Sequence, residues 1–166
     1  MIRAMPLARG AAYGAAAAAF GYAAVSLYWA AGGTAGLSTV GGIAQTMART
    51  GGAAAAAGIA AIVLLKTAGG LLALAMVMPW GRRLPRRAVS VAGLAGSALL
   101  IVYGAVEVAG EALAETGVIR PSAPDWTALR WHLALWDPWF LVWGLLLAAA
   151  TWGYWRSARQ VTKPAL

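Results

Sequence analysis

The sequence predicts an all-α fold: an integral membrane bundle of four transmembrane helices, forming one domain over residues 1–166. Of its residues, 61% are hydrophobic and 11% are charged, whereas soluble domains are nearer half apolar and a quarter charged. The apolar residues gather in four blocks, each long enough to cross a bilayer at about 20 residues per helix. In none of the blocks do apolar and polar residues alternate as they do in the strands of a membrane barrel. Helices are the other structure that satisfies all backbone hydrogen bonds in lipid, so the blocks predict helices.

The four apolar blocks place the helices at residues 11–31, 54–78, 88–109 and 138–155. The first block also allows a cleaved signal peptide, because Arg3 and Arg9 precede it. A membrane helix is favoured there, since the block is long and Tyr28-Trp29 at its far end suits the membrane interface.

Basic residues predict the orientation, because lysine and arginine concentrate in cytoplasmic segments. One side of the predicted bundle carries nine cations: Arg3, Arg9, Arg82, Arg83, Arg86, Arg87, Arg156, Arg159 and Lys163. The other side carries Arg49, Arg120 and Arg130, offset by Glu111, Glu115 and Asp125. Both termini are therefore expected in the cytoplasm, with the chain multi-pass in the plasma membrane. The net charge of +8 then reflects topology and contacts with membrane lipids, and nucleic acid is not an expected partner.

The two outer loops are longer than the inner one, at about residues 32–53 and 110–137. The stretch "IAQTMART" in the first predicts a short helix at the membrane surface. The second contains Pro121 and Pro124, and then Trp126 and Trp131 as interface anchors. Long loops cover pockets, so any specialised chemistry is expected at the outer face.

The stretch "RWHLALWDPWFLVWG", residues 130–144, permits two structures. In the favoured one, the fourth helix starts at Asp137 as N-cap with Pro138 at its first position, after a separate interfacial helix. The alternative is one long helix that is kinked at Pro138 and turns Asp137 into the bundle.

Four ionisable residues, Lys66, Glu107, His132 and Asp137, lie in or beside the apolar blocks at a similar depth, in the outer half. Charges that face lipid cost at least about 2.5 kcal/mol each. The lysine and the carboxylates are therefore expected to pair. His132 is the group among them that changes charge near neutral pH. Glu107, His132 and Asp137 are the candidate catalytic residues, and the alternative is that their ion pairs only stabilise the bundle.

Aromatic residues beside these polar groups predict an apolar pocket. Trp136, Trp139 and Trp143 form a helical stripe that could wall it, and Tyr103 shares a helix face with Glu107. Lys66 would lie at the floor of the pocket. Ordinary packing or lipid contact is the alternative for the stripe.

The chain has no cysteine and one histidine. It lacks the HxxxH and ExxH spacings of metal sites, so no metal ligands are predicted. The phosphate-loop and nucleophile-elbow patterns are also missing, and no cofactor is predicted. Small residues recur at four-residue spacing: Gly10, Gly14, Ala18, and Ala88, Ala92, Gly96. Such rows favour close helix packing, and homo-oligomerisation through them is the alternative.

Two stretches, "GYAAVSLYWAAGGTAGLSTVGG" (21–42) and "RWHLALWDPWFLVWGLL" (130–146), resemble a family of small actinobacterial four-helix membrane proteins known only as a domain of unknown function. The resemblance covers most of the chain, and it implies four helices and no particular activity.

The four-helix plan, the acids near one end, the aromatic last helix and "VYGAVE" (102–107) are also similar to the EXPERA group. That group includes the emopamil-binding sterol isomerases, whose acidic and histidine residues manage a carbocation in a lipophilic pocket. This chain carries Lys66 where those isomerases carry a histidine and a glutamate.

Two functions follow from these observations. The first is an outward-facing pocket that binds a lipophilic, isoprenoid-like small molecule, or isomerises or cyclises it by acid–base chemistry. The second is a non-enzymatic accessory or structural subunit of the membrane.

Overall fold

The computed structural model describes residues 6–122 and 124–161 of the chain, and no strand occurs among them. Four helices are long and apolar enough to cross a membrane. They are α1 (Pro6–Ala30), α3 (Ala53–Ala75), α4 (Arg86–Glu115) and a continuous helix built from α5 (Trp126–Trp131), the π-helical turn η3 (His132–Trp136) and α6 (Asp137–Val161). The all-α class and the number of long helices are thus confirmed.

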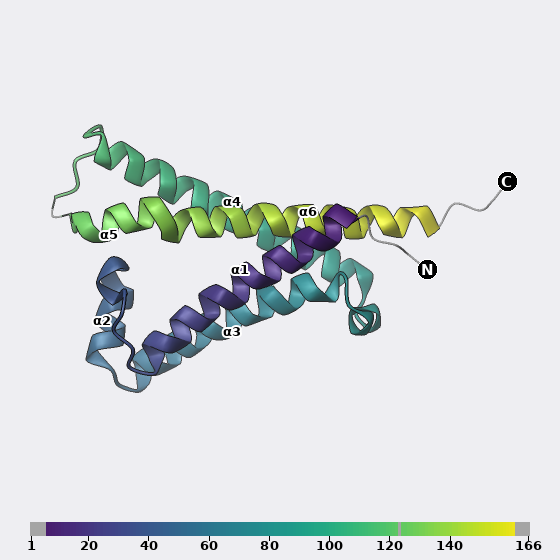
Figure 1. Ribbon diagram of the computed structural model, residues 1–166, viewed down its shortest axis with the longest axis horizontal. Helices are drawn as coiled ribbons and strands as arrows, with labels where there is room; N and C mark the ends of the chain where they lie inside the picture. Colours follow the sequence, from purple (N-terminus) through teal and green to yellow (C-terminus); the bar gives the residue numbers. More distant parts are fainter. Residues whose placement is uncertain (1–5, 123, 162–166) are drawn as a thin grey trace.

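The four helices are arranged as two pairs, α1 with α3 and α4 with α6, and α1 also packs on α6. The pairs lie close together near the end that carries the described chain ends, and they spread apart toward the end that carries α2 and α5 (Figure 1). The cavity described below is lined by residues from both pairs.

Small residues hold α1 against its neighbours. Ala12, Ala15 and Ala19 on α1 are fully buried and pack in one core with Leu147 of α6. Gly14 of the predicted small-residue row faces Leu146, whereas a side chain at Gly10 would meet nothing within 4 Å. The predicted bundle packing therefore accounts for part of this row.

The helices α4 and α6 approach each other backbone to backbone. A Cβ atom at Gly104 would lie 2.8 Å from the backbone nitrogen of Leu141, and one at Gly144 would lie 2.9 Å from that of Ile101. Only glycine fits such a crossing without a shift of one helix.

The short helix expected in the first loop is present, and the bounds of the long helices differ from those predicted. The short helix predicted in the first loop is present as α2 (Gly42–Thr50), after a 3-10 turn, η1 (Leu37–Thr39). The helix predicted at 54–78 ends earlier, at Ala75, and the 3-10 turn η2 (Pro79–Arg83) follows it. The helix predicted at 88–109 extends to Glu115, so Glu111 and Glu115 are helical rather than in a loop.

The favoured prediction that Asp137 caps the last helix is wrong. Asp137 has helical angles, φ −86 and ψ −35, and its N–H bonds to the carbonyl of His132 within the long helix. The cap is Asp125, which accepts from the N–H groups of Thr127 and Ala128. Proline lacks an N–H and its ring clashes with the carbonyl four residues back, and the wider π turn accommodates Pro138 in a continuous helix.

Candidate functional site

The π turn brings His132 and Asp137 together. Side chains five residues apart in a regular α-helix point about 140° away from each other. The π turn has hydrogen bonds from residue i to i+5, and here it aligns these two side chains. His132 Nδ1 lies 2.8 Å from Asp137 Oδ2.

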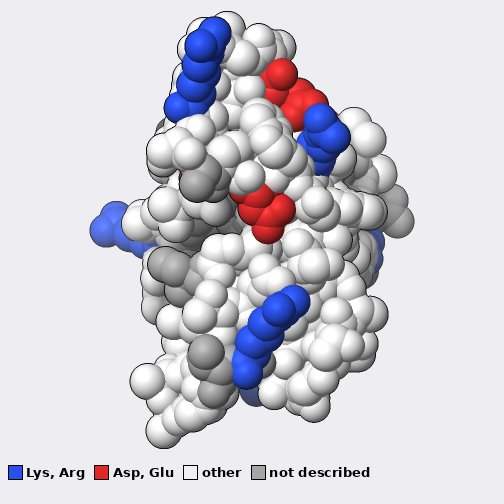
Figure 2. Space-filling model, turned by 90° about the vertical axis from the view of Figure 1, so that its left-hand side faces the viewer, with Lys and Arg blue, Asp and Glu red and all other residues white. Residues whose placement is uncertain are grey.

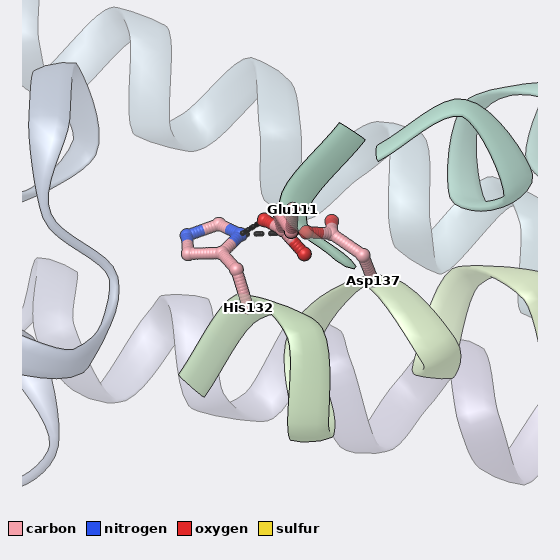
Figure 3. A group of neighbouring side chains, drawn as sticks. All are labelled: Glu111, His132 and Asp137. Carbon is pink, nitrogen blue, oxygen red and sulfur yellow. Dashed lines mark hydrogen bonds and ion pairs between the residues drawn. The ribbon is translucent and has the colours of Figure 1, made fainter. Parts of the chain in front are cut away.

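Glu111 joins this pair from α4 (Figure 3). Its Oε1 lies 3.7 Å from His132 Nδ1. One nitrogen or oxygen atom from each of the three residues lies within 4.8 Å of the others. We call Glu111, His132 and Asp137 the histidine–acid cluster.

The second ring nitrogen of His132 is also engaged. His132 Nε2 lies 2.9 Å from the carbonyl oxygen of Val40, in the loop between η1 and α2. A carbonyl only accepts hydrogen bonds, so Nε2 carries the hydrogen and donates it. This bond ties the loop to the long helix and leaves Nδ1 facing the two carboxylates.

Two buried oxygens of the cluster, Asp137 Oδ1 and Glu111 Oε2, have no hydrogen-bond partner among the described residues. Asp137 is 0% exposed. Arg130 pairs with Glu115 at 3.1 Å and not with the cluster. Two neighbouring carboxylates out of water need positive charge or protons to balance them, and His132 is the side chain in contact with both that can carry a positive charge.

Next to the cluster lies a cavity of about 910 Å³ between α3 and α4, with α1 and α6 behind it. Most of its lining is aliphatic or aromatic. Leu65 and Leu99 line it and are 73% and 68% exposed. The cavity is therefore open at the side of the bundle, between α3 and α4.

Lys66 lines this cavity, and within the described part of the chain it pairs with no carboxylate. Its Nζ donates to Ser26 Oγ at 2.8 Å, and it lies 3.4 Å from the centre of the Tyr22 ring. The expected pairing of Lys66 with Glu107 or Asp137 is therefore not formed.

Three of the five predicted pocket residues, Lys66, Tyr103 and Trp143, line the cavity, and so does the candidate His132. Trp136 and Trp139 do not. Trp136 stacks on Tyr22 and donates from Nε1 to Thr39 Oγ1 at 3.1 Å. Trp139 donates from Nε1 to the carbonyl of Ala18 on α1.

The predicted tryptophan wall is therefore built differently. Trp143 is joined at the cavity by Tyr22, Trp29 and Phe140. Trp136 and Trp139 contact residues of α1 instead of the cavity, because the long helix that carries them also packs on α1.

Of the predicted catalytic residues, the structure brings His132 and Asp137 together, and Glu107 lies outside the cluster. Glu111, four residues further along α4, takes its place. The spacing of Glu107, Glu111 and Glu115 at four residues could have indicated this, because such residues share one helix face.

Acidic side chains are visible on the end of the molecule that carries α2 and α5 (Figure 2). They reach the surface in two places, separated by uncharged atoms, and basic side chains lie beside one of them. The exposed pair of Arg130 with Glu115 lies at this end, because Arg130 is in α5.

Four helices long and apolar enough to cross a membrane, a partly buried histidine–acid cluster and an apolar cavity between α3 and α4 are together compatible with a multi-pass α-helical membrane protein. The family described as "Protein of unknown function (DUF3995)" matches residues 19–147, and the chain belongs to it. This confirms the resemblance to a family of unknown function. The matched residues include Lys66 and the whole histidine–acid cluster. No curated protein and no solved structure matches the chain.

Proposed function

We propose that the protein is a multi-pass plasma-membrane protein that binds a lipophilic small molecule in the cavity between α3 and α4. The cavity carries this proposal. Its volume of about 910 Å³ lies within the range of small-molecule sites, which are mostly apolar with a few polar groups that orient the ligand. Here those groups are Lys66, Ser26, His132 and the tyrosines.

The proposed orientation has both termini in the cytoplasm. The described chain ends lie at one end of the bundle (Figure 1). The link between α3 and α4 carries Arg82 and Arg83 in η2, followed by Arg86 and Arg87 at the start of α4. Cations at this end support a cytoplasmic location by the positive-inside rule. Arg3 and Lys163, which the sequence also assigns to this side, lie outside the described residues.

The ligand that suits the cavity has an elongated apolar body and an electronegative end. An ammonium group has three donors, and Lys66 gives one to Ser26 while it lies over the Tyr22 ring. A further donor is free for a ligand oxygen. The rings of Tyr22, Phe140 and Trp143 suit an unsaturated, isoprenoid-like chain.

The isomerising or cyclising reaction that the sequence suggests needs an acid or base at the cavity wall. Of Glu107, His132 and Asp137, only His132 lines the cavity. That reaction, and with it the likeness to the sterol isomerases, stays a prediction, and binding is the function we propose.

A second candidate is an accessory or structural subunit whose polar contacts only stabilise the bundle. The bond between His132 and the carbonyl of Val40 favours it, because that bond fixes a loop to the long helix. In this case the cavity would hold only bulk lipid.

Mass spectrometry of molecules that co-purify in mild detergent separates the two candidates. Ala92 lines the cavity, and Ala92→Trp places an indole ring in it and narrows it. Ala105 lies on the same helix, is exposed and does not line the cavity, so Ala105→Trp is the matched control. We expect a discrete apolar molecule with wild type and Ala105→Trp, and at least tenfold less with Ala92→Trp. Bulk phospholipid alone in all three folded proteins would support the accessory subunit and contradict binding.

A further inference from the structure

We propose that Glu111, His132 and Asp137 bind a divalent first-row transition metal ion, for which Zn²⁺ is the probe. The proposal does not depend on a ligand in the cavity, because it rests on the histidine–acid cluster alone.

The donor set fits such an ion. An imidazole nitrogen and carboxylate oxygens are ligands for Zn²⁺ and its first-row neighbours. Three protein ligands leave a fourth position open, as in zinc sites that bind water or substrate. The residues come from two helices, α4 and the long helix of α5, η3 and α6, so the ion would also bridge them.

The distances fit as well. Tetrahedral coordination with metal–ligand bonds of 2.0–2.2 Å separates the donor atoms by about 3.4 Å. His132 Nδ1 lies 2.8 Å from Asp137 Oδ2 and 3.7 Å from Glu111 Oε1. These two separations bracket the required value, and the ligand atoms of Glu111 and Asp137 lie within 4.8 Å of each other. Rotations of the carboxylate side chains would bring all three separations to it.

The tautomer of His132 suits metal binding at Nδ1. Its Nε2–H donates to the carbonyl of Val40 at 2.9 Å, so in the neutral ring Nδ1 carries the lone pair. Metal-bound histidines usually donate their other ring N–H to a carbonyl or carboxylate, which fixes the orientation of the ring. Val40 supplies that partner here.

The negative charges of the histidine–acid cluster favour a bound cation. With a neutral histidine the cluster carries two negative charges, and a divalent ion balances them. The buried oxygens Asp137 Oδ1 and Glu111 Oε2 have no partner among the described residues. The nearby cations are engaged elsewhere, since Arg130 pairs with Glu115 and Lys66 contacts Ser26 and Tyr22.

The competing arrangement has a hydrogen on Nδ1 that it donates to Asp137, and then no ion binds. Metal analysis distinguishes the two. The protein is purified with a histidine-free tag, stripped with a chelator and titrated with Zn²⁺ in a calorimeter, and its metal content is measured. We expect one Zn²⁺ per chain. Affinity should fall at least tenfold in Glu111→Gln and in Asp137→Asn, and it should be unchanged in Glu115→Gln, the exposed glutamate next on the same helix face.

X-ray absorption at the zinc edge tests the proposal on wild-type protein, so it does not require the variants to fold. The expected spectrum has nitrogen and oxygen neighbours only, at about 2.0–2.1 Å, with the scattering pattern of one imidazole. The absence of saturable Zn²⁺ binding, a spectrum without imidazole, or wild-type affinity in folded Asp137→Asn would each overturn the proposal. None of these outcomes alters the cavity test with Ala92→Trp.

Discussion

Lys66 is a charged residue in an apolar helix, and its contacts are a hydroxyl and a ring rather than a carboxylate. Lys66 is partly buried, and a charge taken out of water without an opposite charge beside it costs free energy. An apolar side chain of similar size at this position removes that cost. A lysine kept at such a position is therefore better explained by binding than by stability.

Lys66→Met is expected to unfold at the same temperature as wild type or a higher one, and to lose the co-purifying molecule. Thermal unfolding in detergent and mass spectrometry measure the two effects on the same samples. Ser26→Ala is the companion variant, because it removes the hydroxyl partner and keeps the charge. Ligand retained in Ser26→Ala would assign the loss in Lys66→Met to the ammonium group. A large drop in stability for Lys66→Met would instead show that the lysine is structural.

The individual site residues were partly predictable. Lys66, His132 and Asp137 stand out in the sequence because polar residues are rare in apolar blocks. Glu111 was assigned to a loop because the hydropathy of α4 falls after residue 109, while the helix itself extends to Glu115. Hydropathy marks where lipid contact ends, and backbone hydrogen bonding continues past that point.

Among the elements, the contact of α4 with α6 depends on glycine. Gly104→Ala is expected to reduce the free energy of unfolding by about 1–3 kcal/mol, because the new methyl group meets the backbone of α6. Denaturation by a graded harsh detergent, followed by circular dichroism, measures this loss.

Gly110→Ala is the matched control on the same helix, since a Cβ there meets nothing within 4 Å. It is expected to raise stability by up to about 1 kcal/mol through helix propensity. Equal effects of the two substitutions would argue against the close α4–α6 crossing.

The π turn aligns His132 with Asp137, and the two side chains are expected to be energetically coupled. His132→Leu keeps the turn and leaves Asp137 buried without the histidine. Losing one partner of a buried ion pair costs about 3–5 kcal/mol. The same substitution should cost several kcal/mol less in an Asp137→Leu background, as a double-mutant cycle of unfolding energies would show. Equal costs in both backgrounds would disprove the coupling.

The sequence could not reveal the π turn, and this explains the wrong assignment of Asp137. An Asp-Pro pair is equally compatible with a helix start and with a bulge inside a helix. A spacing of five residues between a histidine and an acid also matches no regular helix face. The HxxxH and ExxH spacings of metal sites assume regular helices, so a search of the sequence for them does not reveal the histidine–acid cluster.

For the whole molecule, the number of long helices was predictable because hydropathy and bilayer thickness determine it. The pairing of the helices was not, because lipid-facing and buried residues are similarly apolar. The cavity follows from that pairing, since it lies where the α1–α3 pair diverges from the α4–α6 pair.

The proposed topology can be mapped directly, because the chain contains no cysteine. A membrane-impermeant maleimide should label Thr116→Cys, after α4, in intact cells. It should label Leu84→Cys, in the α3–α4 link, only after the membrane is permeabilised. The opposite pattern would reverse the orientation.

The sideways opening of the cavity between Leu65 and Leu99 has a consequence for how binding depends on the amount of lipid. In the proposed membrane setting, a ligand would arrive by diffusion within the plane of the bilayer. Occupancy would then follow the mole fraction of the ligand in lipid rather than its concentration in water. Diluting the same amount of ligand with more vesicle lipid should therefore empty the site, whereas diluting the vesicles with buffer should not.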